Sequence, residues 1–425
     1  MSADALSSRF AVCAALVVSV LFLPTSADAQ ATFEGLGHRP GGTFSIAYDV
    51  SADGAVVVGR SNYANAQGRT EAFVWTAEAG MIGLGDFDGG NIDSEANAVS
   101  ADGTVVVGWA EGGGAFRWTA QAGLVPLGTL GQNVDYAFGI SADGQVIVGW
   151  GQTASGRESF RWTQQGGMVS IGALGTTLLD SFASDTSADG SVIAGQSLTE
   201  IPFVEPYRWT AAGGMVGLGD VPGGINYGVG YAISDDGEVI VGESISSIGV
   251  EAFRWTEEFG LENLDPVQPT QFTSSADGVS ADGTLIVGAS AQVGGAMVWH
   301  EVWGMRGIQD MLVDDYGLDL TGWTLGAARA ISADKTTIVG YGINPDGHTE
   351  AWRATIPPPV VGDLDGDRTV DVADYTLFAS CWSGPGNVAR PAGCTRSTFI
   401  EADIDADGDV DLRDVARLLA AVDGP

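Results

Sequence analysis

The stretch Ser51-Ala52-Asp53-Gly54-Ala55-Val56-Val57-Val58-Gly59 joins a polar turn phrase to a β-branched run that ends in glycine. Asp-Gly is a preferred β-turn pair and Val is enriched in strands, so the stretch predicts two strands joined by a turn. Further copies of the turn phrase begin at Ser100, Ser141, Ser187, Ser234, Ser280 and Ser332. Their spacings of 41 to 52 residues indicate seven repeats, each of them one supersecondary unit.

A second phrase of alternating polarity follows in every copy, as in Ala72-Phe73-Val74-Trp75. The other copies lie at Ala115–Trp118, Ser159–Trp162, Pro206–Trp209, Ala252–Trp255, Ala296–Trp299 and, with the Trp shifted, Ala351–Ala354. Alternation places the Phe and Trp positions on one sheet face. A glycine turn and a fourth short strand follow, as in Met215–Gly219. Four strands per repeat predict an all-β fold, a seven-bladed β-propeller of four-stranded blades.

The two ends of the repeat region are complementary. The seventh copy stops at Thr355-Ile356 without a fourth strand, whereas Thr32–Gly37 reads as a fourth strand with no repeat before it. The N-terminal strand would then complete the last blade and pair the sheet edges. An open β-solenoid is the architectural alternative. The one long insertion is Gln309–Leu325, which contains Trp323.

The two phrases resemble the HAF family of extracellular repeats, over roughly residues 33 to 356. Two features depart from its pattern: Lys335 replaces the turn glycine, and the Trp of the last copy is shifted. The resemblance implies a secreted or surface protein and no defined activity.

The charge of the chain bears on its partners. There are 54 Asp+Glu against 18 Lys+Arg, a net charge of −36, with 45 % hydrophobic residues. A disordered chain is excluded by that hydrophobic content, and nucleic acid or an anionic membrane is disfavoured as a partner by the charge. With only three His and three Cys, the chain has too few ligands and nucleophiles for most metalloenzyme and cysteine-protease sites.

The N-terminus carries a predicted secretory signal over residues 1–29. Arg9 precedes an apolar run from Phe10 to Leu23, and Ala27 and Ala29 fit an A-x-A cleavage site. The run is too short to cross a bilayer and no later stretch is long enough, so we expect no transmembrane segment. Export would leave Cys381 and Cys394 where disulfides persist, and we expect them to pair, two free thiols being the alternative.

The propeller residues have structural explanations beside functional ones. The Ser-Ala-Asp-Gly phrases would be hairpin turns rather than calcium or sugar sites, and the repeated Trp residues blade packing rather than a carbohydrate-stacking stripe. A binding site is expected on the opposite face, where the loops vary, as at Gly85–Asn91 and Gly219–Gly224. There Asp86, Asp88, Asp93 and Glu95 are candidates for glycoside hydrolysis or are solvated loop carboxylates.

Beyond a Pro-rich linker at residues 357–362, two acidic loops run over residues 363–374 and 403–414. Both place carboxylates at positions 1, 3, 5, 9 and 12, with the position-7 backbone carbonyl available, which is the EF-hand pattern for Ca²⁺. The predicted ligands are Asp363, Asp365, Asp367, Thr369, Asp371 and Asp374 in the first loop, and Asp403, Asp405, Asp407, Asp409, Asp411 and Asp414 in the second. Arg368 stands where the sharp turn prefers glycine.

A short helix is expected after each loop, with Val415, Leu418, Leu419 and Val422 facing Leu377, Phe378, Cys381 and Trp382. Residues 363–425 closely resemble a type I dockerin. The resemblance implies two calcium ions, a cohesin-like protein partner, and partner contacts at Val372, Ala373, Leu412 and Arg413.

The sequence therefore predicts a secreted, calcium-binding, non-catalytic modular protein, found outside the cell or at its surface. In it the propeller of residues 30–356 is a binding domain and residues 363–425 attach it to a partner. The first alternative is a component that degrades or binds an extracellular polysaccharide, and the second a purely structural surface protein.

Overall fold

The computed structural model describes residues 30–423, apart from 88–91, 133, 177–178, 200–202, 222, 226, 248, 265–272, 359 and 405–406. The predicted signal peptide lies outside the described residues. Gln30–Pro359 forms one compact unit and Val360–Pro425 belongs to another. The first unit is all-β except for one short helix, and the second is helical.

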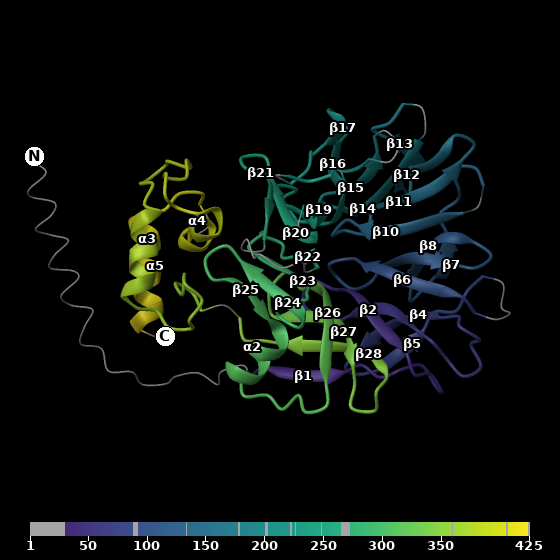
Figure 1. The fold of residues 1–425 in the computed structure, drawn as a ribbon, viewed down its shortest axis with the longest axis horizontal. Coiled ribbons are helices and arrows are strands. Elements are labelled where there is room, and N and C mark those ends of the chain that lie inside the picture. Colours follow the sequence, from purple (N-terminus) through teal and green to yellow (C-terminus); the bar gives the residue numbers. More distant parts are fainter. Residues whose placement is uncertain are drawn as a thin grey trace, which may run out of the picture. The chain divides into compact units, whose positions relative to one another are not determined.

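The described strands of the first unit pair into sheets that are antiparallel except for one short parallel contact in the largest sheet (Figure 1). The first two sheets are β2(Ser45–Val50)-β3(Val57–Ser61)-β4(Glu71–Thr76)-β5(Gly80–Gly83) and β6(Ser94–Val99)-β7(Val106–Ala110)-β8(Gly114–Thr119)-β9(Gly123–Pro126). An eight-stranded sheet follows, made of β10(Asp135–Ile140), β11(Val146–Thr153), β12(Gly156–Thr163), β13(Gly167–Gly172), β14(Leu179–Thr186), β15(Val192–Leu198), β16(Val204–Thr210) and β17(Gly214–Gly217). The last three sheets are β18(Gly228–Ile233)-β19(Ile240–Ser246)-β20(Gly249–Thr256)-β21(Gly260–Asn263), β22(Ser274–Val279)-β23(Leu285–Ser290)-β24(Gly295–His300)-β25(Gly304–Gly307) and β1(Thr32–Gly35)-β28(Thr349–Thr355)-β27(Thr337–Ile343)-β26(Thr324–Ile331). This organisation is a β-propeller-like fold.

The inner strands contact one another in sequence around the unit. β2, β6, β10, β14, β18, β22 and β26 each contact the next, and β26 contacts β2. Ser45 on β2 joins the beginning and the end of this unit, because its hydroxyl donates to the Gly37 carbonyl and accepts from the Ala351 N–H. β1 pairs antiparallel with β28, Thr32 lying opposite Thr355. The prediction that the N-terminal strand completes the last sheet is therefore confirmed.

The Ser-Ala-Asp-Gly phrases form hairpin turns, as predicted. In the first copy the Ser51 hydroxyl donates to Asp53 and accepts from the Val56 N–H, and Gly54 has φ +70°. The turn glycine also has no room for a side chain: a Cβ on Gly103 would lie 2.6 Å from the Val56 side chain of the preceding repeat. Lys335 adopts the same left-handed conformation, with φ +62°.

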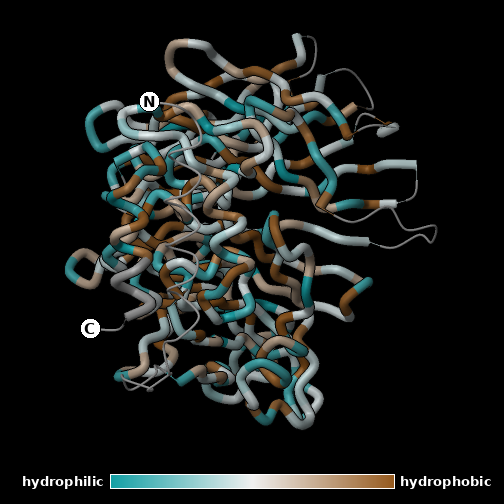
Figure 2. The backbone as a smooth tube through the Cα atoms, turned by 90° about the vertical axis from the view of Figure 1, so that its left-hand side faces the viewer, coloured by the Kyte–Doolittle hydropathy of each residue, from teal (hydrophilic) through white to brown (hydrophobic). Residues whose placement is uncertain are grey.

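The large side chains at the Phe position of the second phrase fill the space between sheets. Phe73 and its counterparts Phe116, Phe160, Tyr207, Phe253, Met297 and Trp352 are completely buried. Trp352 pairs with Gly340 as Phe73 pairs with Gly59, so the shifted Trp of the last copy takes the Phe position without any change of register. Figure 2 shows the resulting mixture of hydrophobic and hydrophilic residues along the strands.

A glutamate directly before the second phrase accepts a hydrogen bond from the backbone just after the fourth strand in several repeats. This contact was not predicted. Glu71 accepts from Gly85 N–H, Glu205 from Gly219 N–H and Glu350 from Gly37 N–H. The insertion after β25 forms helix α2 (Ile308–Asp314), which buries Ile308 and Leu312.

The second unit contains α3 (Val372–Ser380), α4 (Arg396–Ala402) and α5 (Leu412–Asp423). α3 and α5 follow the acidic loops as expected, whereas α4, capped by the Thr395 hydroxyl, was not predicted. Its core contains Leu364, Phe378, Ala402, Val410 and Leu418 around a disulfide between Cys381 and Cys394, as predicted. Trp382 was wrongly placed in this core: its residue surface is 38 % exposed. The side chains of Leu419 and Val422 lie outside the described residues.

No helix in the described part of the chain combines the length and the hydropathy needed to cross a membrane.

Candidate metal centre

The first acidic loop is folded around the carboxylate of Asp363. One of its oxygens accepts from the N–H groups of Gly366 (2.8 Å) and Asp367 (3.1 Å), and the other accepts from Arg368 N–H (2.8 Å). The loop can close this tightly because Gly366 and Arg368 both have positive φ. The loop backbone is thereby wrapped around its first carboxylate.

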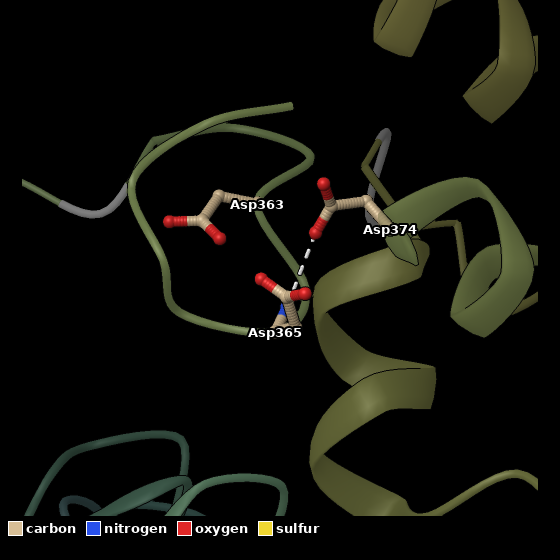
Figure 3. A group of neighbouring side chains, drawn as sticks. All are labelled: Asp363, Asp365 and Asp374. Carbon is tan, nitrogen blue, oxygen red and sulfur yellow. Dashed lines mark hydrogen bonds between the residues drawn. The ribbon is translucent and has the colours of Figure 1, made fainter. Parts of the chain in front are cut away.

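Asp374 closes the loop from the first turn of α3. It is buried, and its two oxygens accept from Leu364 N–H (2.7 Å) and from Asp371 N–H (2.7 Å). One carboxylate oxygen each of Asp363, Asp365 and Asp374 lies within 4.8 Å of the other two. Figure 3 shows these three side chains, with Asp365 donating its N–H to Asp374.

The other predicted ligands of the first loop have different partners. Asp367 accepts from the N–H and hydroxyl of Thr369, and Asp371 caps α3 by accepting from Ala373 N–H. The structure therefore brings three of the predicted carboxylates together and leaves Asp367 and Asp371 in loop and cap hydrogen bonds.

The second loop repeats this hydrogen-bond register forty residues later. Asp403 accepts from the N–H groups of Asp407 and Gly408, as Asp363 does from Asp367 and Arg368. Asp414 accepts from Asp411 N–H at 2.8 Å, as Asp374 does from Asp371. Asp405 lies outside the described residues.

The clustered carboxylates of the second loop are Asp409, Asp411 and Asp414, all of them buried. The EF-hand pattern predicts a backbone carbonyl at position 7, whereas the structure places the Asp409 side chain in the cluster. Its Oδ2 accepts from Gly386 N–H at 2.5 Å, whereas its buried Oδ1 has no hydrogen-bond partner among the described residues. A cation would satisfy such an oxygen, since buried polar atoms are normally paired.

Each loop gathers several carboxylates whose negative charges repel one another. Burial, with the nearby carboxylates of Asp374 and Asp367, raises the pKa of Asp363, although hydrogen bonds from the loop N–H groups act against the rise. Burial, with Asp414 and Asp407, likewise raises the pKa of Asp403. The donor set is oxygen throughout, which suits a hard divalent cation such as Ca²⁺. The residues present therefore fit the predicted ion.

The predicted partner residues occupy matching places at the starts of α3 and α5. Val372 is 70 % exposed and Leu412 69 % exposed. Ala373 donates its N–H to Asp371, and Arg413 donates to Asp411 and pairs with Asp407 at 2.7 Å. Both aliphatic side chains are therefore open to solvent directly beside the acidic loops.

Two of the carboxylates considered for glycoside hydrolysis, Glu95 and Asp93, have partners in the propeller-like unit. Glu95 pairs with Arg60 at 3.1 Å, and Asp93 accepts from Thr70 N–H, while Asp88 lies outside the described residues. A pocket of about 250 Å³ is lined by Thr199, Phe203, Val204, Glu205, Gly219 and Asp220. Its two carboxylates are structural, since Glu205 accepts from Gly219 N–H and Asp220 from the Ser244 hydroxyl.

No family model matches the chain, and no curated protein matches it. The fold is similar to that of oligogalacturonate lyase from Vibrio parahaemolyticus, with TM-score 0.50 and 11 % identity, over 79 % of this chain and 99 % of that one. An oligogalacturonate lyase in complex with manganese gives TM-score 0.46 and 14 % identity over 79 % and 96 % of the chains. TolB from Acinetobacter baumannii gives TM-score 0.40 and 11 % identity, over 72 % of this chain and 65 % of the TolB chain. The first likeness supports the β-propeller fold and nothing about activity.

Proposed function

We propose that this chain is a secreted, calcium-binding, non-catalytic modular protein, in which a propeller presents a binding face and a dockerin-like unit attaches it to a partner protein. The observation that carries the proposal is the equivalence of the two acidic loops, which repeat the same hydrogen bonds at an interval of forty residues. A chance acidic stretch has no reason to repeat a register.

The propeller in this proposal has seven blades of four strands. The eight-stranded sheet counts as two blades because β12 and β14 meet in parallel at Gly156↔Leu179 and Arg157↔Asp180 alone, whereas every other strand pair is antiparallel. Division at this short contact leaves one four-stranded blade for each sequence repeat.

Two calcium ions would be held by the second unit, one in each loop. Residues 363–425 contain 13 Asp+Glu and 5 Lys+Arg, a net charge of −8. Cations would supply the positive charge around which the carboxylates gather, and so couple metal binding to the order of the loops.

The attachment surface would be formed by Val372, Ala373, Leu412 and Arg413. Val372 and Leu412 are the exposed aliphatic residues that a protein partner would cover, and a cohesin-like domain is the partner that the resemblance implies. A purely structural surface protein would have no use for this pair.

Calorimetric titration of Ca²⁺ into the metal-free protein, followed by circular dichroism, tests the proposal. We expect two equivalents and a gain of helix, with one equivalent in Asp363→Asn and one in Asp403→Asn. Asp319→Asn is the matched control, since Asp319 is an exposed loop carboxylate that accepts from Thr321, and should leave two equivalents. No binding would exclude the calcium-binding unit.

Secretion is tested separately by the N-terminus of the exported protein. We expect it to begin at Gln30, after removal of residues 1–29, and an uncleaved chain retained in the cell would contradict the proposal.

A polysaccharide-degrading component is the second candidate, favoured by one observation. Burial raises the pKa of Glu95 above its ordinary value, although the ion pair with Arg60 opposes the rise, and a raised carboxyl pKa is one feature of residues that act in acid catalysis. Release of reducing sugar from a neutral polysaccharide, abolished in Glu95→Gln, would replace the non-catalytic proposal.

A further inference from the structure

One position in the sheets changes its chemistry from repeat to repeat although its backbone pairing stays the same. This position is a pair of residues that lie opposite each other on the first two strands of a repeat. One residue directly follows the glycine that ends the β-branched run, and the other is its partner on the preceding strand. The pairs are Ile46–Arg60, Glu95–Trp109, Tyr136–Trp150, Phe182–Gln196, Val229–Glu243, Ser275–Ala289 and Ala327–Tyr341. Because Ser275 and Ala289 pair in the same way, the sheet does not require aromatic residues there.

Three consecutive repeats nevertheless place large aromatic rings at this position, and the rings touch. Trp109 stacks on Tyr136 with 5.2 Å between centroids, and Tyr136 stacks on Trp150 at 4.8 Å. Trp150 meets Phe182 edge to face at 5.4 Å. All four rings are partly exposed, so together they form a continuous aromatic row that solvent reaches.

The aromatic row lies at the strand ends opposite the Ser-Ala-Asp-Gly turns. Tyr136 is the second residue of β10, which begins at Asp135 and ends at Ile140, directly before the turn at Ser141. Trp109 is the fourth of the five residues of β7. This is the face on which the sequence places the variable loops, and variable loops on a rigid ring are the usual place for a binding site.

The charged groups around the aromatic row are already paired. Arg60 pairs with Glu95 at 3.1 Å, and Arg157 pairs with Asp180 at 2.7 Å. The Arg157 guanidinium also lies 4.6 Å from the centroid of the Phe182 ring, so this chain's own cation takes that cation–π position. An anionic polymer is further opposed by the net charge of −36. The ligand that fits is uncharged, with an apolar face and a polar edge.

We propose that the aromatic row of Trp109, Tyr136, Trp150 and Phe182 binds a neutral oligosaccharide. Sugar rings have C–H faces that pack on aromatic side chains and hydroxyl edges that bond to fixed polar groups, here those of Arg60, Glu95 and Arg157. These Trp residues are distinct from the repeated Trp of the second phrase, which packs between blades. The inference names the ligand class of the binding face, and in that sense rests on the proposed function.

Affinity electrophoresis of the full chain through gels that contain soluble neutral polysaccharides (β-glucan, glucomannan, arabinoxylan or starch) tests this proposal. We expect at least one of them to retard the wild type, and both Trp109→Ala and Trp150→Gln to raise the Kd for that polysaccharide at least tenfold. Gln is chosen at position 150 because the fourth repeat has Gln196 there. Tyr341→Ala, at the same position of the seventh repeat, is the matched control and should bind as the wild type does. Circular dichroism and melting verify that each variant is folded.

Failure of all four polysaccharides to retard the folded wild type would overturn the proposal. So would equal retardation of the wild type and the folded Trp variants, or a stronger effect of polygalacturonate than of any neutral polymer. Each gel is run with Ca²⁺ and with chelator. Retardation in chelator depends on the aromatic row, whereas Ca²⁺ binding depends on Asp363 and Asp403, so either proposal can fail without the other.

Discussion

Arg368 and Gly408 hold the same position in the two acidic loops and adopt the same left-handed backbone, with φ +69° and +91°. Glycine takes this conformation at no steric cost, whereas a residue with a Cβ loses about 1–2 kcal/mol there. The sequence showed that Arg368 breaks the glycine rule, and the structure shows that the loop keeps its shape all the same. The cost is therefore carried by the first loop.

Arg368→Gly should raise the Ca²⁺ affinity of the first loop by roughly fivefold to tenfold, because about 1 kcal/mol of backbone strain is removed. Gly408→Ala is the reciprocal change and should weaken the second loop by a similar factor. Calorimetric titration of both variants measures the two affinities. Equal affinities in wild type and Arg368→Gly would show that the residue at this position does not limit binding.

Asp49 and Asp185 are half-buried residues whose carboxyls lie between consecutive repeats. Asp49 accepts from Val50 N–H and from Val99 N–H of the next repeat, and Asp185 bonds Thr186 and Ile233 in the same way. Burial outweighs these hydrogen bonds and raises the pKa of each carboxyl to about 7. In the unfolded chain both should titrate near pH 4, so the folded state binds their protons more tightly.

The contribution of these two carboxyls to the free energy of unfolding should be largest below about pH 4. Their contribution is then lost as the pH rises toward 7, by about 2–4 kcal/mol each. Asp49→Ala and Asp185→Ala copy Ala98 and Ala232 of the sister repeats, and should reduce the slope of urea-unfolding free energy against pH between 4.5 and 7.5. A slope unchanged in both variants would refute this assignment.

Among the elements of the fold, the hairpin turn is the one that its own local sequence specifies most completely. Its hydrogen bonds join residues at most five apart, as from Ser51 to Val56, so the phrase alone specifies it. Adjacent turns are linked through their backbones, for example by Ala52 N–H donating to the Ala101 carbonyl. The glycine that ends the turn is required twice, by its φ angle and by the side chain of the preceding repeat.

Gly103→Ala should lower the free energy of unfolding by about 2–4 kcal/mol, since it adds left-handed strain to a contact 2.6 Å from Val56. Lys335→Gly is the contrasting change. It relieves the strain at φ +62° but removes the ion pair with Asp282, so we expect a change within about 1 kcal/mol. Urea unfolding compares the two, and a Gly103→Ala protein as stable as wild type would contradict this account.

What the sequence could predict follows from the range of each interaction. Turns, β-branched runs and the carboxylate spacing of the acidic loops are local, and they allowed the sheets, the acidic loops and the disulfide to be expected. The aromatic row joins Trp109 to Phe182 across three repeats, and Glu350 reaches Gly37 across almost the whole propeller-like unit. Such contacts depend on packing, although a position-by-position comparison of the repeats would have marked Trp109 and Trp150 as departures.

At the scale of the whole molecule, the propeller-like unit is joined by its first strand. β1 lies against β28, and Phe33 contacts the rings of Trp323 and Trp352, which come from the insertion and the last repeat. Gly37 is held by Glu350 and by Ser45 at once. A segment of a few residues therefore connects the two ends of the propeller-like unit, Gln30–Pro359.

Removal of residues 30–38 should expose the edge of β28 and the rings that Phe33 covers. We expect a loss of several kcal/mol in urea unfolding and self-association in light scattering, because an unpaired strand edge recruits other chains. A synthetic peptide of residues 30–38 should restore the monomer, whereas one with Phe33→Asp should not. Truncation after Ile356 is the matched control, since it removes the second unit and keeps β1 on β28. If the chain without residues 30–38 is as stable and monomeric as that control, the propeller-like unit is held together without β1.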